Sequence, residues 1–371
     1  MSGFFIQISM VQLESLKIQS FRGFDSLEMS GFSKINILLG KNNSGKTSVL
    51  ESIFLLSGIS NPELALNVNL MRGLPVNKGV LKYIFHNLET HSKPSIIGKF
   101  SQGTNRKVEI SPIFEKNVVS REIETAAPEN SLSTTSLNAV PDILGLEYSF
   151  SIGKEPEPEK KLKTWLRFEK ESIKQVLNAT YKEDIISKFL FSGAVDRGLP
   201  EQLKTLFVAR KEHILNNLLN KIDSTVKGLY VLPNGIYIDK EGISERIPLQ
   251  LMGDGIRRFL NVAATIAANN EQNFICLIDE IENGLHYKSQ ILMWQTLFEL
   301  ARAANIQLFV TTHSWEMLQS LTNVLKQDAY SDMQEKVKVF SIVNTAREGF
   351  QSYSRSFEGL ESSLRNEREF R

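Results

Sequence analysis

"LGKNNSGKTSVLESIFLL", residues 39–56, decides the fold of this chain. Gly40, Gly45, Lys46 and Thr47 have the spacing G-x-x-x-x-G-K-[ST], which is typical of a loop that surrounds nucleotide phosphates. The compact apolar run "KINILLG" leads into this loop and indicates a buried strand, and "TSVLESIFLL" follows it with apolar residues at helical spacing. Strand, loop and helix therefore occur in the order that the motif needs. An ordinary glycine turn before a helix is the weaker interpretation.

A loop of this kind binds phosphate mainly through its backbone. Its glycines let N–H groups close around phosphate oxygens, and the helix N-terminus adds partial positive charge. Lys46 is expected to reach the β- and γ-phosphates, and the Thr47 hydroxyl to bind Mg²⁺. We therefore predict ATP and Mg²⁺ as cofactors. The predicted nucleotide-binding residues of the loop are Gly40, Asn42, Asn43, Ser44, Gly45, Lys46, Thr47 and Ser48.

A second apolar run, "FICLIDE", supplies acidic residues at the end of a predicted strand. Four of the five residues before Asp279 are strongly apolar, which indicates a buried strand with a fixed end. Asp279 is expected to hold Mg²⁺, and Glu280 to face the γ-phosphate as the catalytic base that polarises the attacking water. The alternative is an acidic helix N-terminus, "DEIEN", but the phosphate loop favours the catalytic interpretation. Glu282 either helps to form the site or faces solvent.

A third apolar strand is predicted to end in "VTTHS", residues 310–314. His313 would then follow the strand downstream of Asp279 and Glu280, where its imidazole could donate a hydrogen bond to the γ-phosphate. An isolated histidine is usually a polar residue with ordinary partners. The position after the strand favours a catalytic role for His313.

Composition limits the possible classes of protein. The 371 residues include 43 Lys+Arg and 42 Asp+Glu, so there is no general electrostatic attraction to nucleic acid or membrane, although a local basic patch is compatible with these numbers. The single cysteine, Cys276, excludes a disulfide framework within the chain and fits a cytoplasmic protein. No apolar run approaches the ~18 residues that span a bilayer, so we expect no membrane contact.

The pattern of strands and helices predicts an α/β protein whose core is assembled from both ends of the chain. Residues 1–77 and 227–371 form the predicted core, with strands alternating with helices as in a parallel sheet. Residues 78–226 form a predicted insertion with antiparallel strands, a polar surface loop at "REIETAAPENSLSTTSLNAVPD" and a helical segment from Glu169 to Val226 that would serve as an arm or lid. Asn234-Gly235 predicts a hairpin.

These motifs, in this order, resemble ABC-type ATPases, a class that includes transporter motor subunits, SMC proteins, RecF proteins and the overcoming-lysogenization-defect (OLD) family. The finer resemblance is to OLD-like AAA/ABC ATPases of bacteria and phages. It rests on "LKIQSFRGF", "KINILLGKNNSGKTSVLESI", "LMGDGIRRFLNVAATIA" and "LIDEIENGLHYKSQILMWQTL…QLFVTTHS". These stretches cover about a third of the chain. The resemblance implies an ABC-type core with mixed sheet, an antiparallel β part and a helical insertion.

Two stretches depart from the pattern of ABC transporters. The L-S-G-G-Q signature, which in transporters meets the γ-phosphate of the opposite subunit, is replaced here by Leu251-Met252-Gly253-Asp254-Gly255. The resemblance still implies nucleotide contacts for Gly253, Asp254 and Gly255. Asp254 places negative charge where phosphate is expected; it could instead cap the helix. Arg257 and Arg258 could supply the missing positive charge to the neighbouring subunit, or simply face solvent. The segment "NGLH" also matches OLD-like proteins better than transporters.

OLD nucleases carry a C-terminal Toprim domain with an Asp-x-Asp motif, and this chain has no such motif. The resemblance therefore implies an ATP-driven switch without its own nuclease, which forms a homodimer or higher homo-oligomer around ATP. Its predicted role is to control a separate effector, such as a nuclease or toxin, in anti-phage defence.

Two other interpretations remain open. The first is a RecF-like, ATP-dependent DNA clamp used in repair, which would bind nucleic acid through a basic surface. The second, less favoured because of the altered signature, is a transporter motor subunit.

Overall fold

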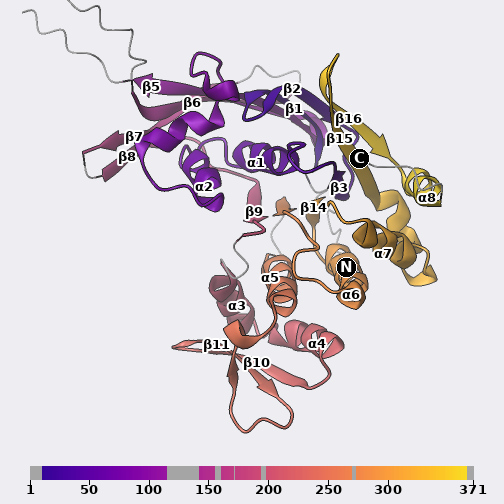
Figure 1. Ribbon diagram of the computed structural model, residues 1–371. Coiled ribbons are helices and arrows are strands. Elements are labelled where there is room, and N and C mark those ends of the chain that lie inside the picture. Colours follow the sequence, from indigo (N-terminus) through magenta and orange to yellow (C-terminus); the bar gives the residue numbers. More distant parts are fainter. Residues whose placement is uncertain are drawn as a thin grey trace, which may run out of the picture.

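The computed structural model describes residues 11–114, 142–154, 160–170, 172–193, 198–269 and 273–365 (Figure 1). Its first sheet is antiparallel and has the strand order β2-β1-β4-β5-β6-β7-β8. Along β1, Leu16 and Ile18 are buried whereas Lys17 between them is partly exposed, so one face of the sheet covers the core and the other faces solvent. In chain order these strands are β1 Leu13–Phe21, β2 Phe24–Ser30, β4 Ser95–Phe100, β5 Thr104–Phe114, β6 Ile143–Lys154, β7 Lys160–Glu169 and β8 Ser172–Val176.

The second sheet has the order β16-β15-β3-β14-β13-β9. Its strands from β15 to β9 are parallel, and β16 is antiparallel to β15. Every residue of β3, β13 and β14 is buried, as expected for parallel strands that are covered on both faces. These strands are β3 Ile35–Leu39, β9 Ile186–Leu190, β13 Phe274–Ile278, β14 Ile306–Thr311, β15 Val337–Thr345 and β16 Gly349–Arg355.

Helices cover both faces of this parallel sheet. Helix α1 lies between the two sheets, and Val49 and Ile53 on α1 pack with Ile275 and Leu277 of β13. The opposite face of β13, including Cys276, belongs to a second core cluster that also contains residues of α3 to α7. The helices are α1 Lys46–Ser57, α2 Leu64–Met71, α3 Leu199–Val208, α4 Glu212–Ile222, α5 Asp254–Ala268, α6 Tyr287–Ala303, α7 Trp315–Leu325 and α8 Phe357–Arg365. Short 3-10 segments are η1 Lys78–Ile84, η2 His86–Leu88, η3 Ser101–Gly103, η4 Leu249–Leu251 and η5 Asp328–Lys336.

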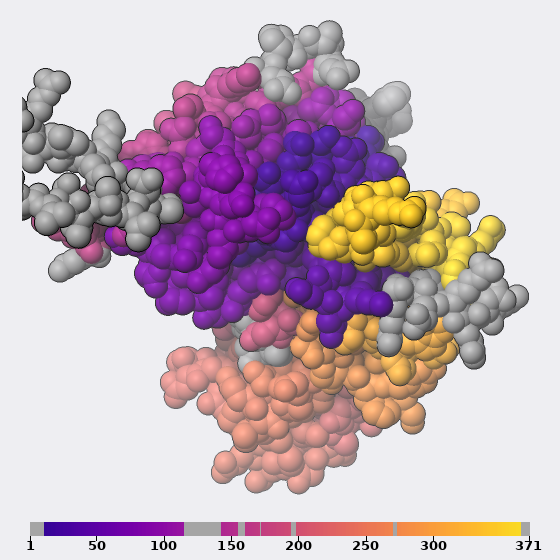
Figure 2. Space-filling model, turned by 45° about the horizontal axis from the view of Figure 1, so that its top comes forward, coloured from indigo at the N-terminus to yellow at the C-terminus, as the bar shows by residue number. Residues whose placement is uncertain are grey.

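The predicted Asn234-Gly235 hairpin is confirmed. It joins β10 (Val226–Leu232) to β11 (Gly235–Lys240), and Leu232 pairs with Gly235. With β12 (Ile247–Pro248) these strands form a third, small sheet beside α3 and α4 (Figure 1). Segments from opposite ends of the chain also meet on the surface, where β16 lies beside β2 (Figure 2).

The predicted continuous helical segment from Glu169 to Val226 is wrong. Its first part contains β8 and β9, and only its second part is helical, as α3 and α4. Strand β9 pairs along its whole length with β13, a partner that lies far away in the sequence. The predicted surface loop before Ile143 lies almost wholly outside the described residues.

The predicted boundaries at residues 78 and 226 do not coincide with boundaries between the sheets. Strands β4 to β8 continue the sheet that β1 and β2 begin, and β9 is an edge strand of the parallel sheet. A functional insertion at residues 78–226 remains a prediction. Within the part of the chain that the structure describes, no helix is long and apolar enough to cross a membrane.

Candidate nucleotide-binding and catalytic site

The loop between β3 and α1 needs glycine at two positions, Gly40 and Gly45, because a larger side chain would clash there. A Cβ on Gly40 would lie 2.3 Å from Ser44 Oγ, and a Cβ on Gly45 would lie 2.4 Å from Phe24 Cζ. Gly45 also has a φ of 88°, in the left-handed region that glycine adopts without steric cost. Asn43, with a φ of 65°, is among the residue types that tolerate this conformation. The loop is therefore held close to Phe24 of β2.

Lys46 folds back over the loop that precedes it. Its Nζ donates hydrogen bonds of 2.9 Å to the carbonyl oxygens of both Gly40 and Lys41, and the residue is only 8% exposed. Burial lowers the pKa of Lys46, while the negative charges of Asp279, Glu282 and Glu280 oppose this change. An ammonium group held in this position can meet phosphate oxygens at the mouth of the loop.

The other hydroxyl and amide groups of the loop differ in their surroundings. Ser44 Oγ is buried and has no hydrogen-bond partner among the described residues, so it could bond to a bound phosphate. Ser48 Oγ accepts a hydrogen bond from Arg72 Nη2 at 3.4 Å. Asn42 and Asn43 are exposed. The loop thus fits a phosphate group, with Ser44 as the unpaired polar atom inside it.

Thr47 and Asp279, the predicted magnesium ligands, are in direct contact. Thr47 Oγ1 donates a hydrogen bond of 2.9 Å to Asp279 Oδ1, and Thr311 Oγ1 donates a second one, at 2.8 Å, to the same oxygen. Asp279 is 2% exposed. Burial raises the pKa of Asp279, and the hydrogen bonds from Thr311 and Thr47 oppose this increase.

This pair is suited to Mg²⁺ with nucleotide. No group of three or more His, Cys, Asp or Glu residues that could hold a metal ion by itself occurs among the described residues. Mg²⁺ at nucleotide sites is usually held by one or two protein oxygens, with phosphate oxygens and water completing the octahedron. One carboxylate and one hydroxyl are therefore a sufficient protein contribution.

Glu280 follows β13 in an unusual backbone conformation. Its φ of 49° lies in the left-handed region, and its N–H donates a hydrogen bond of 2.7 Å to Thr311 Oγ1. The residue is partly exposed, unlike the buried Asp279 beside it. A carboxylate that is accessible to water beside the phosphate loop has the placement that a general base requires.

Glu282, whose role the sequence leaves open, contacts His313. Glu282 Oε1 accepts a hydrogen bond of 2.8 Å from the His313 backbone N–H and lies 2.9 Å from His313 Nδ1. The Glu282 side chain is 11% exposed, whereas the His313 ring is 48% exposed. Glu282 therefore orients the imidazole, and Nε2 is the ring nitrogen left to meet a ligand.

The segment that replaces the transporter signature begins helix α5. Gly253 precedes the helix, and no side chain caps its N-terminus. The predicted capping by Asp254 is wrong, because Asp254 is already the first helical residue and its carboxylate accepts a hydrogen bond of 2.9 Å from Arg257 Nη1. A Cβ on Gly255 would lie 2.4 Å from the Gly284 carbonyl oxygen, so this glycine allows α5 to approach the turn after Glu280.

Arg258, predicted to contact the phosphate of a neighbouring subunit or else to face solvent, is buried within its own subunit in this structure, so the phosphate contact stays a prediction. Arg258 is 1% exposed. Its guanidinium donates to the carbonyl oxygens of Asp279 and Phe191 in its own chain, the latter at 3.2 Å. The side chain therefore points into its own subunit. Arg257 is the more exposed arginine, with 21% of its side chain accessible.

Sequence reasoning missed two other features of the site. Thr311 forms hydrogen bonds with both Asp279 and Glu280. The only sequence signal for this role was its position at the end of an apolar strand. Arg72, at the end of α2, donates to Ser48 and to buried Glu51. Burial would lower the pKa of Arg72, but its hydrogen bond to Glu51 and the charges of Glu51 and Asp279 outweigh burial and raise the pKa. No sequence motif marks Arg72.

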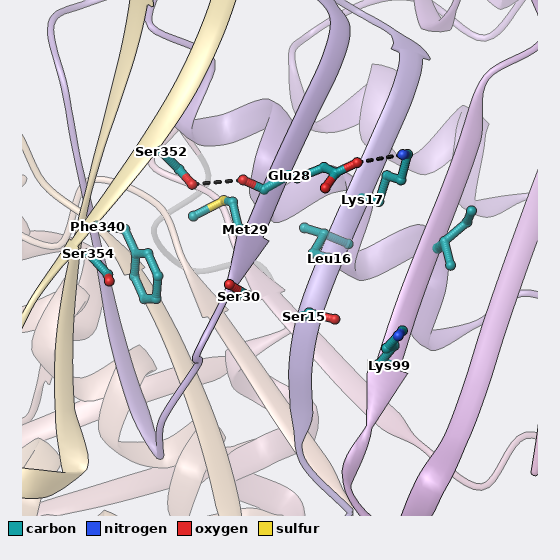
Figure 3. A pocket seen from close by; sticks show the side chains of 11 residues that line it. Ser15, Leu16, Lys17, Glu28, Met29, Ser30, Lys99, Phe340, Ser352 and Ser354 are labelled. Carbon is teal, nitrogen blue, oxygen red and sulfur yellow. Dashed lines mark hydrogen bonds and ion pairs between the residues drawn. The ribbon is translucent and has the colours of Figure 1, made fainter. Parts of the chain in front are cut away.

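A separate cavity of about 470 Å³ lies elsewhere, between the first sheet and strands β15 and β16 (Figure 3). Lys17, Glu28, Met29, Phe340 and Ser352 are among its lining residues. Ser352 Oγ donates a hydrogen bond of 2.8 Å to the Glu28 carbonyl oxygen across it. None of the predicted site residues lines this cavity, so the phosphate loop and the cavity are different places on the molecule.

Comparison with known proteins identifies related sequences over most of the chain. Residues 35–318 match a family model described as "AAA domain, putative AbiEii toxin, Type IV TA system". An "ATP/GTP phosphatase" of Helicobacter pylori (strain ATCC 700392 / 26695) is 24% identical over 352 residues, which cover 89% of this chain and 92% of that protein. The "DNA replication and repair protein RecF" of Clostridioides difficile (strain 630) is 43% identical over 47 residues, 13% of each chain.

The solved structures support the fold. An SMC head bound to the C-terminal winged-helix domain of ScpA has a TM-score of 0.52 and 11% sequence identity, with 93% of this chain and 98% of that chain covered. The predicted fold class, an ABC-type α/β core with mixed and antiparallel sheets plus helices, is confirmed.

Proposed function

Because the chain belongs to this AAA-domain family, whose model matches well over half of it, we propose that it is an ATP-hydrolysing switch of the OLD-like class. Its coarse class, an ATPase domain of the AAA/ABC type, follows from the family and the fold. The observation that carries the proposal is the contact of Thr47 with Asp279, which joins the phosphate loop to the acidic strand end at 2.9 Å. The relative named as an ATP/GTP phosphatase supports hydrolysis rather than binding alone.

The proposed mechanism assigns each group a separate task. The loop and Lys46 bind the phosphates, and Thr47 with Asp279 holds Mg²⁺, which neutralises charge on the phosphate oxygens when it is bound. Glu280 accepts a proton from the water whose oxygen attacks the γ-phosphorus, while the bond from that phosphorus to the β–γ bridging oxygen breaks and ADP leaves. His313, whose Nδ1 donates to Glu282, would donate a hydrogen bond from Nε2 to the γ-phosphate in its doubly protonated, imidazolium form. Phosphate release from purified protein tests hydrolysis: it should need Mg²⁺ and be lost in Lys46→Ala, and equal rates in both proteins would refute the assignment.

We further propose that nucleotide closes two or more copies of the chain around ATP. The support is the SMC-head-like fold, together with an exposed surface at the start of α5, where the side chain of Asp254 is 70% accessible, and at the end of η4 just before it, where Leu251 is 75% exposed. Light scattering of the Glu280→Gln protein should show a larger species with Mg²⁺-ATP than with EDTA. Equal masses with Mg²⁺-ATP and with EDTA, over a tenfold range of protein concentration, would count against this closure.

The defence role remains a proposal that rests on the OLD-like resemblance and on the family description, which names a toxin of a type IV TA system. A separately encoded toxin or nuclease would bind the ATP-bound and the nucleotide-free forms of this protein with different affinities. Only such a difference in affinity lets a partner respond to the nucleotide. Co-purification with Glu280→Gln from the native host tests this. The idea fails if the trapped protein is recovered alone, with and without phage infection.

A second candidate, a RecF-like DNA clamp, is favoured by one surface. Lys99, Lys161 and Arg167 are exposed on the outer face of the antiparallel sheet and make no ion pair with a described residue. Binding of a fluorescent DNA duplex should then weaken steeply with salt. The combined Lys99→Glu and Lys161→Glu substitutions should reduce that affinity. DNA binding that is absent at low salt would eliminate this candidate.

A further inference from the structure

The peptide group between Asp279 and Glu280 is held at both of its polar atoms. Its carbonyl oxygen, on Asp279, accepts a hydrogen bond from Arg258 Nη2. Its N–H, on Glu280, donates a hydrogen bond of 2.7 Å to Thr311 Oγ1. A peptide group is planar, so fixing both atoms fixes the orientation of the whole plane. That orientation, together with the next peptide group, whose Ile281 N–H donates to the Thr311 carbonyl oxygen at 3.1 Å, sets φ of Glu280 and the direction in which its side chain leaves the backbone.

The conformation held in this way is one that glutamate does not favour. Glu280 has a φ of 49°, in the left-handed region where Cβ crowds the following carbonyl. Such residues persist where the surroundings over-determine them, and they cluster at functional sites. Both residues that hold the peptide are themselves buried, with Arg258 at 1% and Thr311 at 0% exposure.

The hydroxyl of Thr311 has a defined polarity. It accepts from the Glu280 N–H, so its only proton is directed at Asp279 Oδ1, 2.8 Å away. The same hydroxyl thus relates the carboxylate of Asp279 to the backbone of Glu280. Arg258 adds a second link, because its other nitrogen, Nη1, donates a hydrogen bond of 3.2 Å to the carbonyl oxygen of Phe191, just after β9.

We infer that Arg258 and Thr311 are positioning residues that aim the Glu280 carboxylate by clamping the Asp279–Glu280 peptide. Arg258 lies on α5, whose exposed N-terminal residues precede it by one turn. A shift of α5 therefore changes the hold on the Asp279 carbonyl and, through the peptide plane, the direction of Glu280. The inference rests on the proposed function, since it takes Glu280 as the general base.

The test combines a rate measurement with a measurement that needs no activity. Arg258→Met keeps a long apolar side chain but donates no hydrogen bond. In the nucleotide-free protein, amide hydrogen exchange of the segment 274–284 should become faster. Where hydrolysis is measured, kcat should fall by roughly tenfold to 100-fold with KM changed less than about twofold, because displacement of a reacting group by 1 Å costs about 100-fold.

Four further variants separate positioning from general loss of stability. Thr311→Val should also speed local exchange and lower kcat, and Thr311→Ser, which keeps the hydroxyl, should restore both. Arg106→Met is the matched control: Arg106 is equally buried, at 1%, but it pairs with Glu183 and Asp184 away from the site. It should lower the melting temperature while leaving kcat and the exchange of 274–284 unchanged. Arg258→Lys, which can reach only one carbonyl oxygen, provides the second variant if Arg258→Met does not fold.

Several results would overturn the inference. These are unchanged local exchange in a folded Arg258 variant, unchanged kcat, or an equal loss of kcat in Arg106→Met. Absence of Mg²⁺-dependent hydrolysis in the wild-type protein would refute the proposed function instead. The exchange measurement would then still decide whether Arg258 and Thr311 hold the peptide.

Discussion

Replacing Asp279 by asparagine should stabilise the protein without nucleotide and destroy its response to nucleotide. Asp279 is 2% exposed and burial raises its pKa above the ordinary 3.8, so the native state holds the charged carboxylate at a cost. Asparagine is nearly isosteric and keeps an oxygen that can accept from Thr47 and Thr311, which lie 2.9 and 2.8 Å away. Asp279→Asn therefore removes the cost of the buried charge and keeps most of the hydrogen bonding.

The sign and size of this effect follow from proton linkage. A carboxyl whose pKa is raised on folding binds more protons in the native state, so the wild type loses stability as the pH rises from the ordinary carboxyl pKa to the raised one. A tenfold change in an acid dissociation constant corresponds to about 1.4 kcal/mol. We expect Asp279→Asn to unfold at a higher temperature than wild type at neutral pH in EDTA. A change of 1 kcal/mol moves the melting temperature of a 150–250-residue protein by roughly 2–4 °C, and that of this 371-residue chain by less. The two proteins should converge as the pH approaches the ordinary carboxyl range.

With Mg²⁺ and a slowly hydrolysed ATP analogue, the wild type should have the higher melting temperature of the two proteins. Ligand at 100 times its dissociation constant stabilises a protein by about 2.7 kcal/mol, and only the wild type has the carboxylate to hold the metal. Thermal unfolding followed by dye fluorescence measures both conditions. Asp332→Asn is the control: the hydrogen bonds from Arg302 and Lys336 lower the pKa of this exposed carboxyl, so its loss should slightly lower the melting temperature and leave the ligand response intact. The reasoning fails if Asp279→Asn is less stable than wild type in EDTA, or if nucleotide stabilises both equally.

Other substitutions test the loop and the network beneath it. Gly45→Ala should destabilise the protein by about 2–5 kcal/mol in urea unfolding, because its Cβ would lie 2.4 Å from Phe24 Cζ in a left-handed backbone; Gly73→Ala, which has a similar φ but open space, should cost clearly less. Lys46→Ala should weaken nucleotide binding roughly tenfold to 100-fold in a fluorescence titration, the loss expected for a charged hydrogen bond of about 1.5–3 kcal/mol, and an unchanged affinity would refute its phosphate contact. Glu51→Leu should destabilise by about 3–5 kcal/mol, because it leaves buried Arg22 without its ion-pair partner; a cost below about 1 kcal/mol would show that water replaces the carboxylate.

The parts of the site that could be predicted from sequence are those fixed by local pattern. The apolar run before Asp279 predicted a buried strand, and the loop spacing predicted the position of Thr47, so their contact follows once β3 and β13 lie in one sheet. The burial of Arg258 was not predicted because a basic residue near a helix N-terminus resembles an exposed anion contact. Only the tertiary fold shows that two carbonyl oxygens lie within reach of its guanidinium.

In the fold, too, local patterns were predicted from sequence and contacts between distant segments were not. Strand β9 was missed because residues 186–190 are apolar enough for either a helix or a strand, and their partner, β13, is more than 80 residues away. The left-handed φ of Glu280 was also invisible, since no glycine marks it. Such features depend on contacts between distant segments, and no local pattern encodes them.

The central claim is that Glu280 is the base of a magnesium-dependent ATPase. Phosphate release by wild type and by Glu280→Gln, measured with nucleotide affinity on the same preparations, tests it most directly. We predict equal affinities and a rate at least about 100-fold lower in Glu280→Gln, the size of a general-base contribution. Phosphate release by Glu280→Gln at the wild-type rate would contradict the claim.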